Sequence, residues 1–284
     1  MEENRNGTLT VVATPIGNLG DITPRAAEAL RDADVIAAED TRRTLRLLNY
    51  LEIKNTLISC HRHNEELRTD HILSLLQQGQ NVALVSDAGT PGISDPGAVI
   101  IKAAADAGIP VTMTPGPAAC IEALVLSGLP TERFVFEGFL PMNKKNRRER
   151  LAALRDEYRT MIFYEAPHKL TDTLKDLCET FGGDRRVALC RELTKVHEEI
   201  DRTTLGEACA RFAEQQPLGE FVLVVAGAEP SEEEQDISAE TIARDVAARV
   251  DSGMRVKDAA KETAKQFGIP ARDAYQAYLE FKED

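Results

Sequence analysis

The sequence lacks the features expected of a secreted or membrane-spanning protein. It contains no apolar run of about eighteen residues, the length needed to cross a bilayer. Its first residues, MEENRNGTLT, are polar and acidic and do not resemble a signal peptide. We therefore expect a cytoplasmic protein with no membrane partner, and its 284 residues are enough for two domains that each bury a core.

The cysteines show no pattern typical of a metal site or a disulfide framework. There are five of them, an odd number, and no two form a CxxC pair. We predict no metal site and interpret these residues as small buried hydrophobic side chains. They are Cys60, Cys120, Cys178, Cys190 and Cys209.

Positive charge is scarce but clustered. The formal net charge of −13 argues against a general nucleic-acid binder, because neutralisation of phosphates drives such binding. However, Arg42, Arg43 and Arg46 form one basic group, and residues 144–150, KKNRRER, form a second. Each group is either a local RNA contact or a solvated helix face, and the sequence leaves both interpretations open.

Apolar, β-rich runs alternate with helical segments over the first 127 residues. The clearest run is NVALVSD at 81–87, which Gly79 and a Gly/Pro-rich loop enclose. This alternation predicts an α/β domain with a parallel sheet over 1–127. The expected strands are 8–14, 35–40, 56–60, 81–87 and 109–115, and helices are expected after Thr23, from Thr41, Asn64 and Pro96, and after Pro117.

A second series follows the turn-rich segment SGLPTER at 127–133 and predicts a second, mixed α/β domain over 128–228. Its expected strands are 134–139, 160–165, 185–193 and 219–227, and its expected helices are 144–158, 167–181 and 204–215. The acidic segment 228–236 is typical of a linker. Residues 237–284, with Ser238 as a helix cap, predict three short helices that resemble a helix-turn-helix.

A loop of unusual composition, SDAGTPGISDPG at 86–97, follows the clearest strand. Ligands bind at this edge of open α/β sheets, yet the loop has neither a GK[ST] phosphate motif nor a GxGxxG turn. Its glycines would let the main chain approach a bulky neutral or zwitterionic ligand. Similar loops, TPIGNLGDIT at 14–23 and TPGPAA at 114–119, also follow strands. We expect all three to meet at one cleft, although strained structural turns are the alternative.

Nine motifs occur in an order that resembles the tetrapyrrole methylase superfamily. They are TPIGNLGDIT, AEDTR, HRHNE, SDAGTPGISDPG, PGPAA, EGFLP, FYEAPHKL, RELTKVHEE and GEFVLVVAG. The chain is most similar to the branch that 2′-O-methylates a cytidine in the decoding region of small-subunit ribosomal RNA. The resemblance implies two tandem α/β domains, a small helical extension, a homodimer, and S-adenosylmethionine (SAM) as methyl donor between the two domains.

The resemblance also implies site residues. The cofactor-binding candidates are Pro15, Gly17, Asp87, Ala88, Gly89, Ile93, Pro117, Ala118, Ala119, Tyr164, Glu165, Leu189, Cys190, Glu220 and Phe221. Candidates for the acid–base and positioning chemistry of methyl transfer are Glu39, Asp40, Glu165, His168 and Lys195. The RNA-binding candidates are Arg42, Arg43, Lys144, Lys145, Arg147, Arg148 and Arg191, because arginine and lysine bind phosphate.

Several of these assignments have structural alternatives. Glu39 and Asp40 could cap the helix that begins near Thr41, Glu165 could hydrogen-bond the cofactor ribose, and His168 could support a helix N-terminus. The sequence therefore does not identify the general base. The alternative functions are C-methylation of a precorrin or other tetrapyrrole, non-catalytic binding of SAM or RNA, and hydrolysis of a nucleotide phosphate. For RNA methylation we expect the assembled small subunit to be the substrate, because an acidic protein needs a large structured target.

Overall fold

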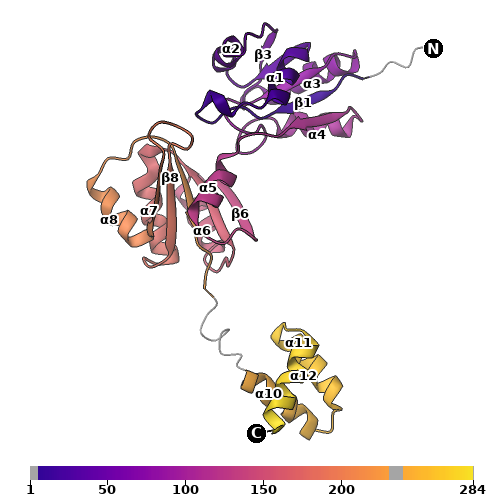
Figure 1. Ribbon diagram of the computed structural model, residues 1–284, viewed down its shortest axis with the longest axis vertical. Coiled ribbons are helices and arrows are strands. Elements are labelled where there is room, and N and C mark those ends of the chain that lie inside the picture. Colours follow the sequence, from indigo (N-terminus) through magenta and orange to yellow (C-terminus); the bar gives the residue numbers. More distant parts are fainter. Residues whose placement is uncertain (1–5, 230–238, 284) are drawn as a thin grey trace, which may run out of the picture. The chain divides into compact units, whose positions relative to one another are not determined.

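The computed structural model describes residues 6–229 and 239–283. The chain forms two compact units, Met1–Ala228 and Glu229–Asp284. The first unit contains two five-stranded sheets and the second contains three helices (Figure 1). This confirms the predicted fold class of tandem α/β sheets followed by a small helical extension.

The first sheet is parallel throughout, as predicted. Its order is β3-β2-β4-β1-β5, and its strands are β1 (Leu9–Val12), β2 (Val35–Ala38), β3 (Leu57–Ser59), β4 (Val82–Val85) and β5 (Val111–Thr114). Every residue of the central strand β4 is buried, because helices cover both faces of a parallel sheet. The following helices are α1 (Pro24–Asp32), α2 (Thr41–Tyr50), α3 (Glu65–Gln77), α4 (Ala98–Asp106) and α5 (Ala119–Ser127), with a 3₁₀ turn η1 at Leu19–Asp21.

Local sequence explains where these helices begin. The Thr23 hydroxyl accepts a hydrogen bond from the Ala26 N–H at 3.1 Å, and Pro24 fills the first helical position. The sequence predicts that a helix begins at Pro96, but helix α4 begins two residues later, at Ala98. Gly97 adopts a φ of 131°, which is incompatible with a helix and makes it the residue before the first turn.

The second sheet is mixed, as predicted, with the order β6-β7-β10-β8-β9. Its strands are β6 (Phe134–Phe139), β7 (Thr160–Glu165), β8 (Arg186–Arg191), β9 (Glu199–Thr204) and β10 (Phe221–Val225). Strands β6 and β7 are parallel, and the remaining pairs are antiparallel. The helices are α6 (Lys144–Ala153), α7 (Pro167–Phe181) and α8 (Leu205–Glu214).

Two details of this half differ from prediction. Strand β9 was not expected, because its sequence EIDRTT is largely polar. The strand lies at the edge of the sheet, and its residues do not alternate between buried apolar and exposed polar side chains. Helix α6 ends at Ala153 rather than Tyr158. The chain turns there: the Glu157 carboxylate accepts hydrogen bonds from the backbone and side chain of Arg159, just before β7.

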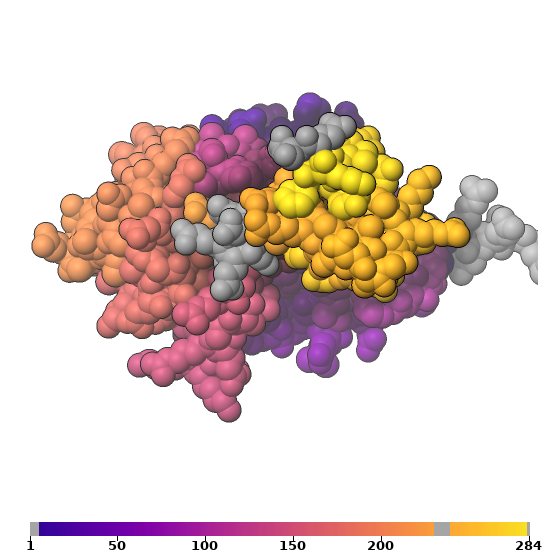
Figure 2. All heavy atoms as spheres, turned by 90° about the horizontal axis from the view of Figure 1, so that it is seen from below, coloured from indigo at the N-terminus to yellow at the C-terminus, as the bar shows by residue number. Residues whose placement is uncertain are grey.

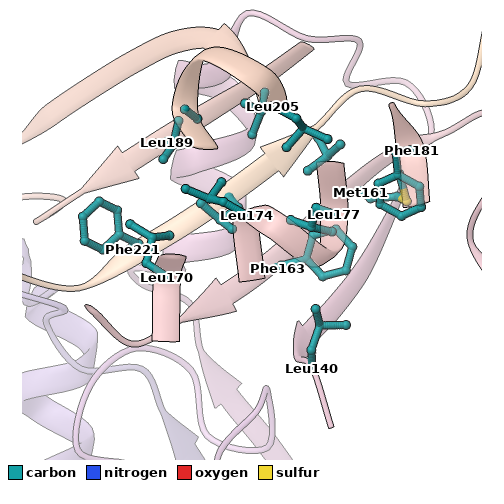
Figure 3. Close-up of a cluster of buried hydrophobic side chains, with 14 of the residues drawn as sticks. Leu140, Met161, Phe163, Leu170, Leu174, Leu177, Phe181, Leu189, Leu205 and Phe221 are labelled. Carbon is teal, nitrogen blue, oxygen red and sulfur yellow. The ribbon is translucent and has the colours of Figure 1, made fainter. Parts of the chain in front are cut away.

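The second sheet is covered on both faces. Helix α7 packs Leu170, Leu174 and Leu177 against one face, where Phe163 and Leu189 project from the strands (Figure 3). Helix α5 packs against the opposite face. This helix precedes the predicted domain boundary at residues 127 and 128, yet its buried side chains contact the second sheet. The boundaries 1–127, 128–228 and 237–284 remain predictions.

The second unit consists of α10 (Ala239–Asp251), α11 (Val256–Phe267) and α12 (Ala271–Glu283). The three helices bury a small, alanine-rich core and form one closely packed body, drawn from orange to yellow in Figure 2. Gly253 and Gly268 have positive φ at the two turns, a conformation that glycine adopts without steric cost. Most of the predicted linker 228–236, and Ser238, lie outside the described residues. Along the described chain, no helix is both long and apolar enough to cross a membrane.

Candidate active site

The three Gly/Pro-rich loops meet beyond the carboxyl ends of the adjacent strands β4, β1 and β5. Thr14 and Gly89 exchange two backbone hydrogen bonds of 2.9 Å, which join the first loop to the second. The Thr90 hydroxyl donates a hydrogen bond to the Pro117 carbonyl at 3.3 Å, which joins the second loop to the third. The predicted convergence of the loops is therefore confirmed.

A cavity of about 440 Å³ opens beside these loops. Its walls come from both sheets: the first half of the unit contributes loop residues, and the second contributes the ends of β6, β7, β8 and β10. The candidates that line it are Glu39, Arg43, Asp87, Ala88, Gly89, Ile93, Ala118, Ala119, Tyr164, Glu165, Cys190, Lys195, Glu220 and Phe221.

The remaining candidates do not line this cavity. Pro15, Gly17, Pro117 and Leu189 lie in the same segments as lining residues, and the Cβ of any larger residue at Gly17 would come within 2.6 Å of the Lys195 side chain. His168 is exposed on the first turn of α7. The basic candidates outside the cavity are Arg42, Lys144, Lys145, Arg147, Arg148 and Arg191.

Three carboxylates give the cavity a negative wall. The Asp87 N–H donates a hydrogen bond to Glu39 at 3.2 Å, and the Asp40 N–H donates to Asp87 at 2.9 Å. Burial raises the pKa of Glu39. The pKa of Asp95 rises to about 6, first because the group is buried and second because the charges of Glu39 and Asp87 repel its anion.

Asp40 adopts the structural role that we had considered as its alternative. Its carboxylate caps α2 by accepting the Arg42 N–H at 2.8 Å, and it binds the Arg42 guanidinium at 2.8 Å. Hydrogen bonds from Arg42 lower the pKa of Asp40 to about 2. Asp40 and Arg42 therefore neutralise each other's charge, and neither residue lines the cavity.

The opposite wall is built around Tyr164. Its hydroxyl accepts a hydrogen bond from the Cys120 N–H at 3.1 Å, and Phe136 and Phe139 pack edge-on against its ring. Burial raises the pKa of the Tyr164 phenol, so it stays neutral. Burial also raises the pKa of the Cys190 thiol to about 12, which makes it part of an apolar wall and not a nucleophile.

Glu165 and Lys195 are held by partners. Glu165 is only 5% exposed and accepts hydrogen bonds from the Thr173 hydroxyl and the Ala166 N–H. Lys195 binds Glu220 at 2.7 Å and Glu192 at 2.9 Å. Burial alone would lower the pKa of Lys195, but the hydrogen bonds to these carboxylates outweigh it and raise the pKa. Lys195 therefore remains a cation and cannot serve as a base.

The sequence interpretation missed several lining residues, including Thr90, Ser94, Asp95, Phe139 and Leu193. Three of them lie inside the loop SDAGTPGISDPG, and Phe139 lies in the motif EGFLP. All five residues lie within motifs that the sequence shows, so the motifs predict the right segments but not these individual residues. The sequence does not single out Asp95, because its raised pKa depends on burial and on the charge of Glu39, which lies in another segment of the chain.

The lining fits SAM, a cationic nucleoside without phosphate. The carboxylates of Glu39, Asp87 and Asp95 provide negative potential for a sulfonium, and apolar side chains such as Ile16 and Val222 provide surface for an adenosine. At Gly89 the φ of 76° and the nearby Ile16 methyl, 3.3 Å from where a Cβ would lie, leave room for main chain alone. Within the described residues, no cluster of cations lines this cavity as a polyphosphate site would require.

Comparisons with known proteins agree with this architecture. The model of the tetrapyrrole (corrin/porphyrin) methylases matches residues 8–209, and that of the RsmI C-terminal HTH domain matches residues 235–282. Ribosomal RNA small subunit methyltransferase I of Synechocystis sp. is 49% identical over 98% of this chain and 99% of its own length. The protein of the same name from Escherichia coli O157:H7 is 45% identical over 98% and 96%.

Solved structures share the fold at lower identity. The methyltransferase CobJ is 23% identical with a TM-score of 0.59, over 78% of this chain and 95% of its own. A uroporphyrin-III C-methyltransferase from Thermus thermophilus, solved with S-adenosyl homocysteine, is 18% identical with a TM-score of 0.53, over 77% and 96%. The chain therefore belongs to the tetrapyrrole methylase family and, within it, to the group of ribosomal RNA small subunit methyltransferases I.

Proposed function

We propose that this protein transfers the methyl group of SAM to the 2′-hydroxyl of a cytidine in the decoding region of small-subunit ribosomal RNA. The observation that carries the proposal is similarity to rRNA methyltransferases along nearly the whole chain, including the three-helix unit. Similarity to solved methyltransferases at 16–23% identity, among them a uroporphyrin III C-methyltransferase, reflects the fold alone. The substrate would be the assembled small subunit in the cytoplasm.

The cavity residues have distinct proposed roles in holding SAM, which supplies a methyl carbon already activated by its sulfonium. Main chain at Gly89 and Ala118 would approach the ligand closely, while Tyr164 and Phe221 would pack against it. Glu39 and Asp87 would hold the cationic end by their charge. Positioning of this kind accounts for much of the rate of a displacement reaction.

Asp95 is our proposed proton acceptor for the ribose hydroxyl. A base works best when its pKa is near the working pH, and the pKa of Asp95 rises to about 6 through burial and neighbouring charge. In the described part of the chain its carboxyl accepts no hydrogen bond, whereas Glu165 is held by Thr173 and Ala166. Asp40 is held by Arg42, and His168 lies outside the cavity. Glu39 and Asp87 line the same cavity, but each already accepts a backbone hydrogen bond from the other's segment, so we assign the proton to Asp95.

We also propose that the protein is a homodimer. Helix α5 buries one face against the second sheet but exposes Ile121 and Val125, and Val125 is 66% exposed. The edge strand β5 exposes Val111 and Met113. Apolar side chains exposed on an edge strand and on a helix are typical of association surfaces. Light scattering should show a dimer for the wild type and a monomer for Val125→Glu; a monomeric wild type would overturn this proposal.

The first experiment is to incubate the protein with methyl-labelled SAM and small subunits that lack their native methylation. Nuclease digestion and mass spectrometry then locate the label, which we expect on a cytidine ribose. Protein that binds SAM but leaves the subunit unlabelled would overturn the proposed reaction, and a tetrapyrrole acceptor would be tested next. Free rRNA forms a parallel arm: equal or faster methylation of free rRNA would overturn the assembled subunit as substrate.

A further inference from the structure

A second cavity, of about 400 Å³, lies between the beginning of α6 and the outer side of α7. Five cationic side chains and three carboxylates line it, together with Pro141 and Met142. A local excess of positive charge is unusual on a chain whose formal net charge is −13. We call this cavity the α6–α7 groove.

Part of the charge in the groove has a structural role. The Arg147 side chain is 12% exposed, and its guanidinium binds Asp176 and donates a hydrogen bond to the Thr173 hydroxyl at 2.8 Å. The ammonium of Lys175 lies 4.0 Å from the carboxylate of Glu179. These two pairs cancel most of the charge on the α7 side of the groove, and Arg147 is too deeply held to be free for a ligand.

The remaining cations have no carboxylate partner among the described residues, although the Lys169 ammonium donates a hydrogen bond to the sulfur of Met142. Lys144, Arg148 and Lys169 line the groove, and none of them forms an ion pair with any residue that the structure describes. Lys144 and Arg148 are exposed one turn apart on α6. Of the three carboxylates that line the groove, Asp172 alone has no ion pair with a described residue. The groove therefore offers one guanidinium and two ammonium groups to an anion.

Two chain segments link the groove to the 440 Å³ cavity proposed to hold SAM, which we call the SAM cavity. Phe139 and Pro167 line the SAM cavity, and Pro141 and Lys169, two residues further along each segment, line the groove. A chain-like anion whose reacting unit lies at the mouth of this cavity would therefore reach the groove with its neighbouring units. Tetrapyrroles are compact and would not extend in this way, whereas a single-stranded RNA segment would.

We infer that the α6–α7 groove binds phosphodiester groups of the rRNA strand that flanks the methylated nucleotide. This inference rests on the proposed function and adds a subsite to it. Arg148 provides a forked donor for phosphate, while Lys144 and Lys169 act as point charges. Such contacts position a strand without reading its sequence, so they set affinity and register while the cavity selects the nucleotide.

The test compares two triple variants of the full-length protein. The first is Lys144→Gln/Arg148→Gln/Lys169→Gln. The matched control, Arg25→Gln/Arg31→Gln/Lys54→Gln, removes the same charge from exposed residues that line neither cavity. Circular dichroism and binding of S-adenosylhomocysteine establish that both variants are folded. Methylation of small subunits gives kcat and KM, and anisotropy measures binding of a fluorescent decoding-region oligonucleotide.

We expect the groove variant to raise KM and oligonucleotide Kd by about tenfold or more, while kcat and S-adenosylhomocysteine binding change less than twofold. The slope of log Kd against log salt should fall by up to about 2, because three contacts to single-stranded phosphates are lost. The control should leave KM and Kd within about twofold of the wild type. Equal effects in both variants, or an unchanged KM in the groove variant, would overturn the inference.

The two readouts separate this inference from the proposed function. A wild type that methylates subunits, with a groove variant of normal KM and Kd, overturns the groove alone. A wild type that binds the oligonucleotide through the groove but methylates no RNA overturns the methylation and supports the groove. A wild type that neither methylates nor binds RNA overturns both.

Discussion

Replacing Asp95 with asparagine should lower the rate of methyl transfer and, at the same time, raise the stability of the folded protein. Asparagine preserves the shape of the side chain but cannot accept a proton or carry a charge. If Asp95 is the proton acceptor, kcat should fall by about 100-fold or more, which is the usual contribution of a general base. Binding of S-adenosylhomocysteine should weaken much less, because main chain and apolar side chains provide most of the proposed contacts.

The same variant should be more stable than the wild type above neutral pH. The pKa of Asp95 rises from its ordinary 3.8 to about 6, and each pKa unit corresponds to about 1.4 kcal/mol, so ionisation costs the fold up to about 3 kcal/mol. Solvent reaches part of the side chain, which reduces the expected gain to about 1–2 kcal/mol. Because the folded pKa is raised, this penalty is absent below about pH 4, develops between pH 4 and 6, and is complete above pH 6.

Urea unfolding between pH 4 and 8 and the pH profile of kcat/KM measure the two effects. The wild-type profile should rise through about pH 6 to a plateau, and that rise should disappear in Asp95→Asn. Asp70→Asn is the matched control, since Asp70 is an exposed aspartate outside the cavity, and it should change neither stability nor rate. An Asp95→Asn enzyme with normal kcat, or a stability difference that does not depend on pH, would refute the reasoning.

Three further substitutions probe the walls of the cavity. Gly89→Ala should lower the free energy of unfolding by about 1–3 kcal/mol and weaken S-adenosylhomocysteine binding, because φ at Gly89 is positive and other atoms lie close to the new Cβ. The control is Gly108→Ala, where φ is also positive but the surrounding space is open; it should cost only about 1 kcal/mol and leave binding unchanged. Tyr164→Phe should lower stability by about 1 kcal/mol in urea unfolding, because the Cys120 N–H loses its acceptor, and equal stability would exclude that bond. Thr173→Val should cost about 1–3 kcal/mol, measured in the same way, because it leaves a buried carboxylate without its hydroxyl donor; a neutral effect would contradict this.

Much of the fold could be predicted because it depends on local patterns. The apolar run of β4 is buried on both faces, as its composition indicates, and Thr23 followed by Pro24 caps α1 as such a pair usually does. Strand β9 could not be predicted in this way. Its polar residues pair with β8 at the sheet edge, and the hydrogen bonds that define the strand come from a neighbour and not from its own pattern.

The basic cluster on α6 illustrates the same limit for the site. By sequence, residues 144–150 carry five equivalent cations. In the structure Arg147 is bound by Asp176 of α7, and Arg150 is bound by Glu137 of β6 at 2.6 Å. Lys144 and Arg148 keep their charge free of ion pairs among the described residues. Carboxylates on other elements therefore decide which of these cations are available to RNA. The sequence of the cluster alone does not show which cations they bind.

The carboxylates of the cavity follow from strand order in a similar way. Strands β2 and β4 are neighbours with Ala38 opposite Val85, so the residues that follow them, Glu39 and Asp87, must lie close together. Their repulsion is offset because each accepts a backbone N–H from the other segment. Asp95 enters the same field from the far end of the loop without such a donor among the described residues, and its pKa rises. Burial first, and then the charges of Glu39 and Asp87, make Asp95 costly to ionise, and no hydrogen bond from the described residues offsets that cost. The same environment makes Asp95 suited to accept a proton near neutral pH.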